Sequence, residues 1–209
     1  SFLTAFGIFW GIFMLISLMG GAKGLQQMLS RQFEGFATNS GFLGTNKTSK
    51  AYKGFQQGRY WDLENKDVER VRKQVSELET VTATLAKWGI NAIYNENKIS
   101  GTLKGLYPEY QKIEEPNIVF GRFINDVDIR DQRKVCVIGK RIYETLFPGG
   151  EDPCGKFIEV NGIYYRVIGV SMAVGNISIQ GQSETSVIIP FSTMQQNYNF
   201  GQNVQLLCY

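Results

Sequence analysis

The first twenty residues constrain this chain more than any other stretch. The run Phe2–Met19 reads FLTAFGIFWGIFMLISLM, without a charged residue or a proline, and Thr4 and Ser17 are its polar side chains. As a helix it would be about 27 Å long, close to the hydrocarbon thickness of a bilayer, about 30 Å. In lipid, a single segment satisfies all of its backbone polar groups only as a helix. The sequence therefore predicts a membrane-spanning helix or an uncleaved anchor.

A buried core helix and a cleaved signal peptide are the alternatives for this run. A core helix usually keeps a polar stripe, which is lacking here. A signal peptide ends in a small-residue cleavage site, whereas Gly20-Gly21-Ala22-Lys23 leads directly into more helix-compatible sequence. Apolar residues at helical spacing continue to about Phe36, so we expect the helix to leave the membrane as a stalk.

Five glycines of this helix are candidate packing or hinge sites. Gly7 and Gly11, and likewise Gly20 and Gly24, are four residues apart and share a helix face, where a second helix could approach closely. Gly20-Gly21 is a candidate soft point, because each glycine is about 1 kcal/mol poorer than alanine inside a helix. The competing explanation is that glycine is common in membrane helices.

Composition limits what the rest of the chain can do. Its 209 residues, 43% of them hydrophobic, suffice for one modest domain beyond the anchor. A net charge of +3, small and dispersed, predicts no nucleic-acid partner. The chain has no histidine, which excludes Ser-His and Cys-His catalysis and histidine-ligated metals. Cys136, Cys154 and Cys208 are far apart, so we expect separate thiols and neither a zinc site nor a disulfide framework.

Hydrophobic periodicity predicts an α+β fold, with helices packed on a mostly antiparallel or mixed sheet. A helix capped by Asp62 or Asn65 should come first, and its apolar face is formed by Val68, Val71, Val75 and Leu78. The expected later elements are a half-buried strand at 80–85, a hairpin of Asn91–Tyr94 and Ile99–Gly105 around residues 95–98, a strand Lys134–Ile138, a helix Arg141–Phe147, a hairpin of Phe157–Val160 and Ile163–Val170 around Asn161-Gly162, and strands Ser186–Ile189 and Gln205–Cys208.

No stretch predicts a catalytic, cofactor or metal site. Asp126, Asp128 and Asp131 lack the glycine and glutamate of a calcium loop, which favours a solvated acidic turn. The segment Gly149–Lys156 is superficially similar to a phosphate loop, but it lacks the G-x-x-x-x-G-K-[ST] order and precedes an expected strand. Cys154 lies near Lys156 but has no base to activate it.

Several short motifs nevertheless follow one another in a specific order. They are Gly121-Arg122-Phe123, Asp126 and Asp128, Lys134–Gly139, Leu146-Phe147, Asp152–Lys156, Asn161-Gly162 and Val167–Val170, preceded by Gly105–Tyr110 and followed by Val187–Phe191. With this order and the leading helix, nearly the whole chain resembles the periplasmic core domain of MacB-type ABC transporter permeases.

The resemblance implies an inner-membrane permease subunit that is not itself an enzyme, with residues of about 22–209 in the periplasm. Its implied partners are a separate ABC ATPase subunit or domain, a second permease in a homodimer or heterodimer, membrane lipid, and a periplasmic adaptor or lipoprotein. The implied division is a transmembrane helix at 1–21, a stalk helix at 22–37, the first half of a porter-like α/β part at 38–130, a small strand-rich subdomain at 131–190, and a return to the porter-like part at 191–209.

On this basis we expect a fragment of a permease that passes ATP-driven conformational change to periplasmic clients. The alternatives are a membrane-anchored enzyme, for which the sequence offers no nucleophile with a base, and a membrane-anchored extracytoplasmic ligand-binding sensor, since a ligand pocket need not be visible in a sequence. Three further apolar spans downstream would indicate a permease, and a kinase-like or cyclase-like domain would indicate a sensor.

Overall fold

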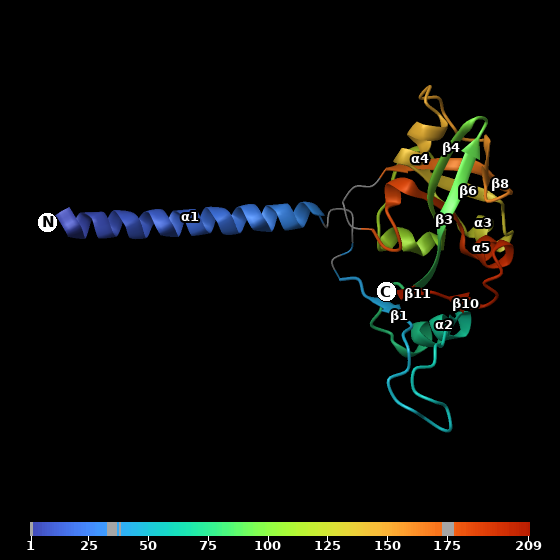
Figure 1. Cartoon of the computed structure of the whole chain (residues 1–209), viewed down its shortest axis with the longest axis horizontal. Helices are drawn as coiled ribbons and strands as arrows, with labels where there is room; N and C mark the ends of the chain where they lie inside the picture. The colour runs from blue at the N-terminus through green and yellow to red at the C-terminus, as the bar shows by residue number, and fades with distance from the viewer. Residues whose placement is uncertain (1, 33–36, 38, 173–177) are drawn as a thin grey trace.

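A long helix projects from a mixed α/β domain (Figure 1). The computed structural model describes residues 2–32, 37, 39–172 and 178–209, with the backbone alone for residues 30–32. Helix α1 spans Phe2–Gln32 and continues unbroken through Gly20-Gly21. Within the described residues it is the one helix long and apolar enough to cross a membrane, over Phe2–Leu29 with a mean hydropathy of 2.1, and this segment is not buried against the domain. The helix thus continues beyond Met19 to Gln32, and its role as a stalk outside the membrane remains a prediction. The last part of the expected stalk, including Phe36, lies outside the described residues.

The domain alternates strands with short helices. After α1 its elements are β1 Phe42–Gly44, β2 Leu63–Glu64, α2 Asn65–Gln74, β3 Thr82–Tyr94, β4 Asn97–Leu106, the 3-10 helix η1 Pro108–Lys112, β5 Asn117–Gly121, α3 Asp126–Arg130, β6 Val135–Gly139, α4 Lys140–Leu146, β7 Phe157–Val160, β8 Ile163–Met172, the 3-10 helix η2 Ser183–Thr185, β9 Ser186–Pro190, α5 Phe191–Asn197, β10 Asn203–Val204 and β11 Leu206–Cys208.

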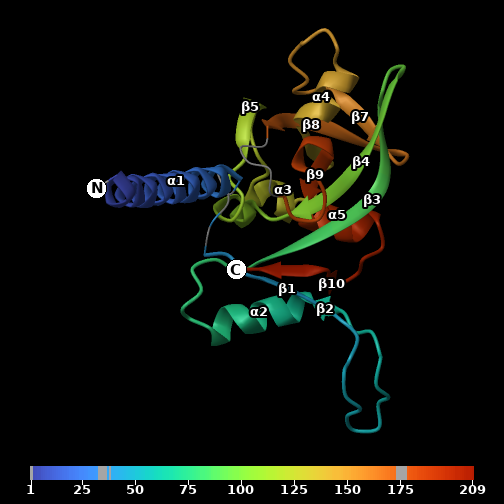
Figure 2. The same cartoon turned by 60° about the vertical axis from the view of Figure 1, so that its left-hand side comes forward.

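Nine strands form one sheet in the order β1-β11-β3-β4-β9-β6-β8-β5, with β7 paired to both β3 and β8. The pairs β4–β9 and β6–β8 are parallel, and the other pairs of this sheet are antiparallel. The α+β class with a mixed sheet is thus confirmed. Figure 2 shows the curvature of β3 and β4 as they pass across the domain. The parallel β4–β9 pair connects strands from 38–130 to strands from 131–190, and the proposed boundary between these parts remains a prediction.

Both faces of the central strands are covered. One cluster of buried side chains includes Leu85, Leu103 and Ile189, and a second includes Tyr110 and Val137. The expectation of a half-buried strand at 80–85 was therefore wrong, because residues 82–86 are all buried, the threonines included. Alternation of threonine with apolar residues predicts one wet face, but threonine is small enough to be covered by a second layer.

Two expected strands are in fact one. The segments 80–85 and 91–94 merge into the 13-residue β3, whose register with β4 shifts between Trp88 and Ile90. Gly89 lies at this irregularity with φ of +69°, a conformation that glycine adopts easily, and so accommodates a bulge. The turn to β4 is also shorter than expected and consists of residues 95–96, since β4 begins at Asn97.

Helix α2 begins and ends differently from the prediction. Its N-cap is Glu64, which forms a capping box with Asp67, and neither Asp62 nor Asn65 serves as the cap. The helix ends at Gln74, so Val75 is an exposed C-cap and Leu78 packs against the core from the following loop. The helical spacing of apolar residues in the sequence extends beyond the end of the helix because Leu78, which lies in the following loop, packs on the same core cluster as the helix.

The remaining expected elements are confirmed within one or two residues. They are β6, α4, the β7–β8 hairpin around Asn161-Gly162, β9 and β11. Sequence reasoning missed the edge strands β1 and β5 and the short helices α3 and α5, since elements this short carry little periodicity.

Gly121 offers a stability test of the sheet edge. Its φ is +68°, and an added Cβ would lie 2.1 Å from the carbonyl oxygen of Ile168, so Gly121→Ala combines backbone strain with a clash against backbone. We expect it to lower the free energy of unfolding by about 2–4 kcal/mol, measured by urea denaturation. Gly149→Ala is the matched control, because nothing lies within 4 Å of its added Cβ. Equal effects of the two substitutions would contradict this account.

Candidate functional site at the junction of helix and domain

The chain enters the domain through a short set of backbone hydrogen bonds. The Ala37 N–H donates to the carbonyl oxygen of Ile113 at 2.8 Å, directly after η1. The Ser40 hydroxyl donates back to the Ala37 carbonyl at 2.6 Å. Because residues 33–36 alone separate α1 from Ala37, these bonds mark the first described attachment of the helix to the domain.

The next attachment is to the end of the described chain. Gly41 and Tyr209 exchange two backbone hydrogen bonds, of 2.7 and 3.0 Å. The pairing continues as β1 against β11, and β11 pairs in turn with β3. Movement of residues 37–44 would therefore be passed directly to the sheet through β11.

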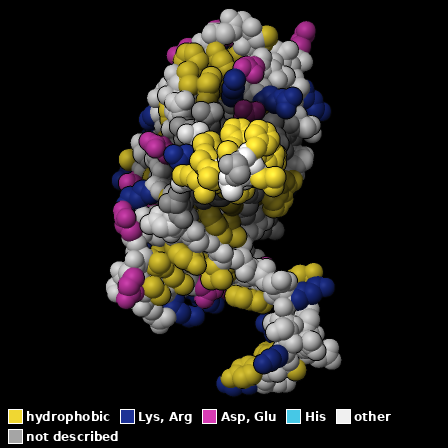
Figure 3. Space-filling view, turned by 90° about the vertical axis from the view of Figure 1, so that its left-hand side faces the viewer, with side chains coloured by type: hydrophobic (Ala, Val, Ile, Leu, Met, Phe, Trp, Pro, Cys, Tyr) yellow, Lys and Arg dark blue, Asp and Glu magenta, His cyan; other side chains and the backbone are white. Residues whose placement is uncertain are grey.

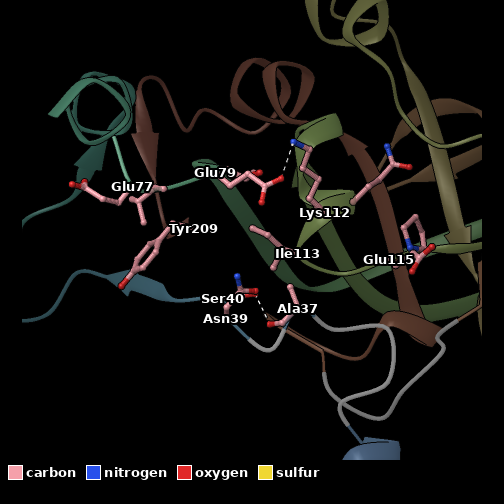
Figure 4. Close-up of a pocket in the computed structure, with 13 residues that line it drawn as sticks. Ala37, Asn39, Ser40, Glu77, Glu79, Lys112, Ile113, Glu115 and Tyr209 are labelled. Carbon is pink, nitrogen blue, oxygen red and sulfur yellow. Dashed lines mark hydrogen bonds and ion pairs between the residues drawn. The ribbon is translucent and has the colours of Figure 1, made fainter. Parts of the chain in front are cut away.

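A hollow of about 890 Å³ opens beside these attachments, and we call it the junction pocket (Figure 4). It is lined by Ala37, Asn39 and Ser40, by the loop 77–80, by residues from 111–116, and by Tyr209. Its charged lining residues are three carboxylates, Glu77, Glu79 and Glu115, and one lysine, Lys112, which pairs with Glu79 at 3.8 Å. Its walls also include apolar side chains, among them Leu78, Ile113 and Tyr209. The pocket is thus a partly apolar hollow with an acidic rim.

Behind Ile113, a buried polar network joins this entry point to the sheet. Glu114 accepts hydrogen bonds from the Tyr110 hydroxyl at 3.0 Å and from the Ser183 hydroxyl at 2.6 Å. Lys104 on β4 donates to the Ser178 hydroxyl at 3.0 Å and to the Gly181 carbonyl at 2.9 Å. The Lys104 side chain is almost fully buried.

The charge of Lys104 is costly in this position. Burial lowers the pKa of Lys104, and the nearby negative charge of Glu114 offsets part of that effect. Burial, reinforced by the charge of Glu114, raises the pKa of Tyr110 well above its usual value. Through these hydrogen bonds Lys104 ties residues 178 and 181 to β4, and Tyr110 ties η1 to Glu114.

The expected solvated acidic turn is wrong for Asp128, whereas Asp126 and Asp131 are exposed. The Asp128 side chain is fully buried and receives two hydrogen bonds from Arg122, at 2.6 and 3.1 Å. Burial alone would raise the pKa of Asp128, but the bonds from Arg122 and from the Asn125 N–H, with the charges of Arg122 and Arg133, hold this pKa below its usual value. Arg122 and Asp128 thus form an ion pair that ties β5 to α3. Among the described residues, no group of three or more potential ligand side chains could hold a metal ion.

The segment before β7 also has a structural role. Lys156 pairs with Glu151 at 2.6 Å and lies over the rings of Phe147 and Tyr94. Burial, together with the hydrogen bond to Asp152, raises the pKa of the Cys154 thiol to about 11, so this thiol is unreactive at neutral pH. Cys136, Cys154 and Cys208 are separate free thiols, as predicted.

The five candidate glycines all lie on the exposed helix α1. An alanine Cβ at Gly7, Gly11, Gly20, Gly21 or Gly24 would meet nothing within 4 Å. The structure therefore does not bring these glycines to the junction, and their roles in packing or bending remain predictions. The junction itself was missed because its groups come from residues 37, 113 and 209, and the pairing of Gly41 with Tyr209 leaves no mark in local sequence.

Comparison with known proteins places this arrangement in context. The family model of the MacB-like periplasmic core domain matches residues 1–207. The macrolide export ATP-binding/permease protein MacB of Bdellovibrio bacteriovorus is 25% identical over 203 residues, which are 97% of this chain and 31% of that protein. The protein of the same name from Chlorobium phaeobacteroides is 27% identical over 198 residues, 92% of this chain and 29% of that protein. The chain therefore spans about three-tenths of the length of these curated relatives.

Two solved structures share the fold. The periplasmic region of MacB from Actinobacillus actinomycetemcomitans superposes with a TM-score of 0.66 at 20% identity, covering 84% of this chain and 76% of that chain. The extracellular domain of the ABC-type transporter YknZ from Gram-positive bacteria gives a TM-score of 0.62 at 20% identity, covering 80% of this chain and 82% of that chain.

Replacing Asp128 tests the ion pair between β5 and α3. Asp128→Asn keeps the shape but removes the charge that Arg122 and Arg133 face, so we expect a loss of about 1–3 kcal/mol of unfolding free energy at pH 7. Because the folded pKa of Asp128 is lowered, its contribution is present above about pH 4 and is lost as the pH falls through the folded pKa. Chemical denaturation between pH 7 and pH 3 should show a smaller acid-induced loss in the variant. Asp126→Asn, at an exposed position on the same helix, is the control, and an equal effect there would refute the assignment.

Proposed function

The chain belongs to the MacB-like periplasmic core domain family, and from this premise we propose that it transmits ATP-driven movement from the membrane to clients outside the cytoplasm. The observation that carries the proposal is the route of the chain. An uninterrupted helix of 31 residues leads to residues hydrogen-bonded to η1 and to β11. A stiff helix joined in this way passes a displacement to the sheet as a rigid-body movement.

In this proposal α1 crosses the inner membrane among lipids, and residues of about 22–209 lie in the periplasm. ATP is hydrolysed by a separate ABC ATPase subunit or domain, and the chain itself catalyses no reaction. The names of the curated relatives, ATP-binding/permease proteins for macrolide export, support the pairing of this domain with an ATPase. A second permease, as a homodimer or heterodimer, would complete the assembly, and a periplasmic adaptor or lipoprotein would receive the movement.

The proposed division of labour follows the family pattern. Residues 38–130 and 191–209 would form the porter-like part that receives the stalk, and residues 131–190 the small strand-rich subdomain, and the two parts together would pass movement to a client. The contact of residues 37–44 with β11 supports the first assignment, because the stalk meets strands of the porter-like part.

Topology is tested by a cysteine at Lys98, an exposed position next to Asn97. In a Cys154→Ser background, Lys98→Cys should react with an impermeant maleimide in intact cells whose outer membrane has been permeabilised. The two remaining cysteines are buried and should stay unlabelled. Labelling that requires detergent lysis of the inner membrane would place the domain in the cytoplasm and overturn the proposal.

Force transmission is tested by breaking the helix at the membrane exit. Two prolines inserted between Gly20 and Gly21 of the full-length permease should leave basal ATPase activity intact and abolish export, because proline costs about 3 kcal/mol in a helix interior. Insertion of two alanines at the same point is the matched control, since it lengthens the helix without breaking it. Export by the proline variant at the parent's rate, with equal expression, would show that α1 carries no force.

The same position separates the two proposed roles of the glycines. Replacing both Gly20 and Gly21 by alanine should favour the helix by about 2 kcal/mol of propensity. Loss of cross-linking between two permeases would assign these glycines to helix packing. A changed ratio of export to ATP hydrolysis, with cross-linking intact, would assign them to a hinge.

A further inference from the structure

One ordered loop projects from the domain and packs against none of its described core clusters. We call residues 45–61 of this loop the arm; Asp62 completes the loop between β1 and β2. Near its base, Thr48 and Arg59 are joined by a backbone hydrogen bond of 3.0 Å, and the Gly58 N–H donates to the Thr48 carbonyl at 2.8 Å. At its tip, Tyr52 and Phe55 exchange two backbone hydrogen bonds. The arm is therefore a defined structure, and it extends sideways from the axis of α1 in two views (Figures 1 and 3).

The arm concentrates positive charge. It contains Lys47, Lys50, Lys53 and Arg59 and no acidic residue, a net charge of +4. Since the whole chain carries +3, the other residues together sum to 3 − 4 = −1. With the adjoining Asp62 the whole loop 45–62 carries 4 − 1 = +3. A surface with this excess of cations is suited to an acidic partner.

The arm also exposes aromatic rings beside these cations. Tyr60 and Trp61 are 72% and 42% exposed, and Tyr52 and Phe55 are exposed as well. Arg59 lies over the Phe55 ring at 4.4 Å, and Lys47 lies over the Tyr60 ring at 4.8 Å. A hollow of about 320 Å³ opens among these side chains. Aromatic residues and arginine are enriched in protein interfaces.

The same chain presents the complementary surface at the junction pocket. Glu77, Glu79 and Glu115 against Lys112 give this pocket a net charge of 1 − 3 = −2, and its apolar wall could receive a ring. Its volume of about 890 Å³ is large enough for several side chains. The arm leaves β1 at Gly44 and points away from the body of the domain, so it does not fill the pocket of its own copy.

We propose that the arm of one copy docks into the junction pocket of a second copy of this chain. This inference rests on the proposed function in one respect: two copies must lie side by side in one membrane. In that arrangement an arm that extends sideways from α1 reaches the neighbouring copy. Two such contacts, related by a two-fold axis, would satisfy both arms and both pockets. They would clamp the domain dimer at the residues through which each stalk enters, so that the two stalks move together.

The contact is tested by disulfide cross-linking of the full chain in nanodiscs of zwitterionic lipid. Two differently tagged populations in a Cys154→Ser background carry Tyr52→Cys on the arm or Gln111→Cys in the pocket, and the rate of the mixed disulfide is measured. We expect this rate to exceed at least tenfold that of Tyr52→Cys paired with Glu144→Cys, an exposed site on α4. It should also fall as salt is added, because exposed charges are screened. Equal rates for the two pairs would overturn the proposal.

Charge-reversal variants test whether the arm of a second copy is what occupies the junction pocket. Lys50→Glu with Lys53→Glu on the arm, or Glu77→Lys with Glu115→Lys in the pocket, should each slow cross-linking about tenfold, since like charges oppose docking. Combining the two pairs should restore the rate. Lys73→Glu with Lys98→Glu changes the net charge equally outside both surfaces and should have no effect. Lack of rescue, or an arm reversal that changes only binding to vesicles of anionic lipid, would show that the arm serves another partner. Neither result would affect the helix-breaking test of force transmission.

Discussion

The position of β11 between β1 and β3 is the interaction on which the junction depends. Strand β1 has three residues and pairs only with β11, so without β11 the chain leaving the helix would have no place in the sheet. The exchange of two hydrogen bonds between Gly41 and Tyr209 begins this pairing at the point where the chain enters the domain. Residues at opposite ends of the sequence are thereby fixed to each other, and a displacement of the stalk reaches the central strands through backbone bonds, which deform less readily than side-chain contacts.

Buried charges hold the elements around this sheet in register. Asp128 accepts bonds from Arg122 and thereby fixes α3 against the end of β5. Lys104 and Glu114 do the same for residues 178–183 and for the segment after η1. Removing one member of such a group of paired charges lowers the free energy of unfolding strongly, because the other charge stays buried without a partner. The intact group, in contrast, adds little net stability. Their contribution is therefore to the geometry of the domain.

Among the described residues, no group of three or more side chains could hold a metal ion, and the surfaces most informative about function are those that face outward. The helix exposes an apolar surface to lipid, the junction pocket exposes carboxylates, and the arm exposes cations and rings. Under the proposed function, surfaces of this kind are where an ATPase-driven neighbour or a client would hold the domain.

The sequence by itself determined the local structure and the family. An uncharged run of bilayer length predicted α1, the Asn-Gly pair predicted the β7–β8 hairpin, and motif order indicated the permease family. These features depend on neighbouring residues or on their order along the chain. Tertiary structure alone decided that residues 82–94 form one bulged strand, that Asp128 is buried and paired with Arg122, and that residues 37, 113 and 209 form the junction. Each of these depends on packing between elements, and local periodicity carries no information about which segment will cover or pair with a residue.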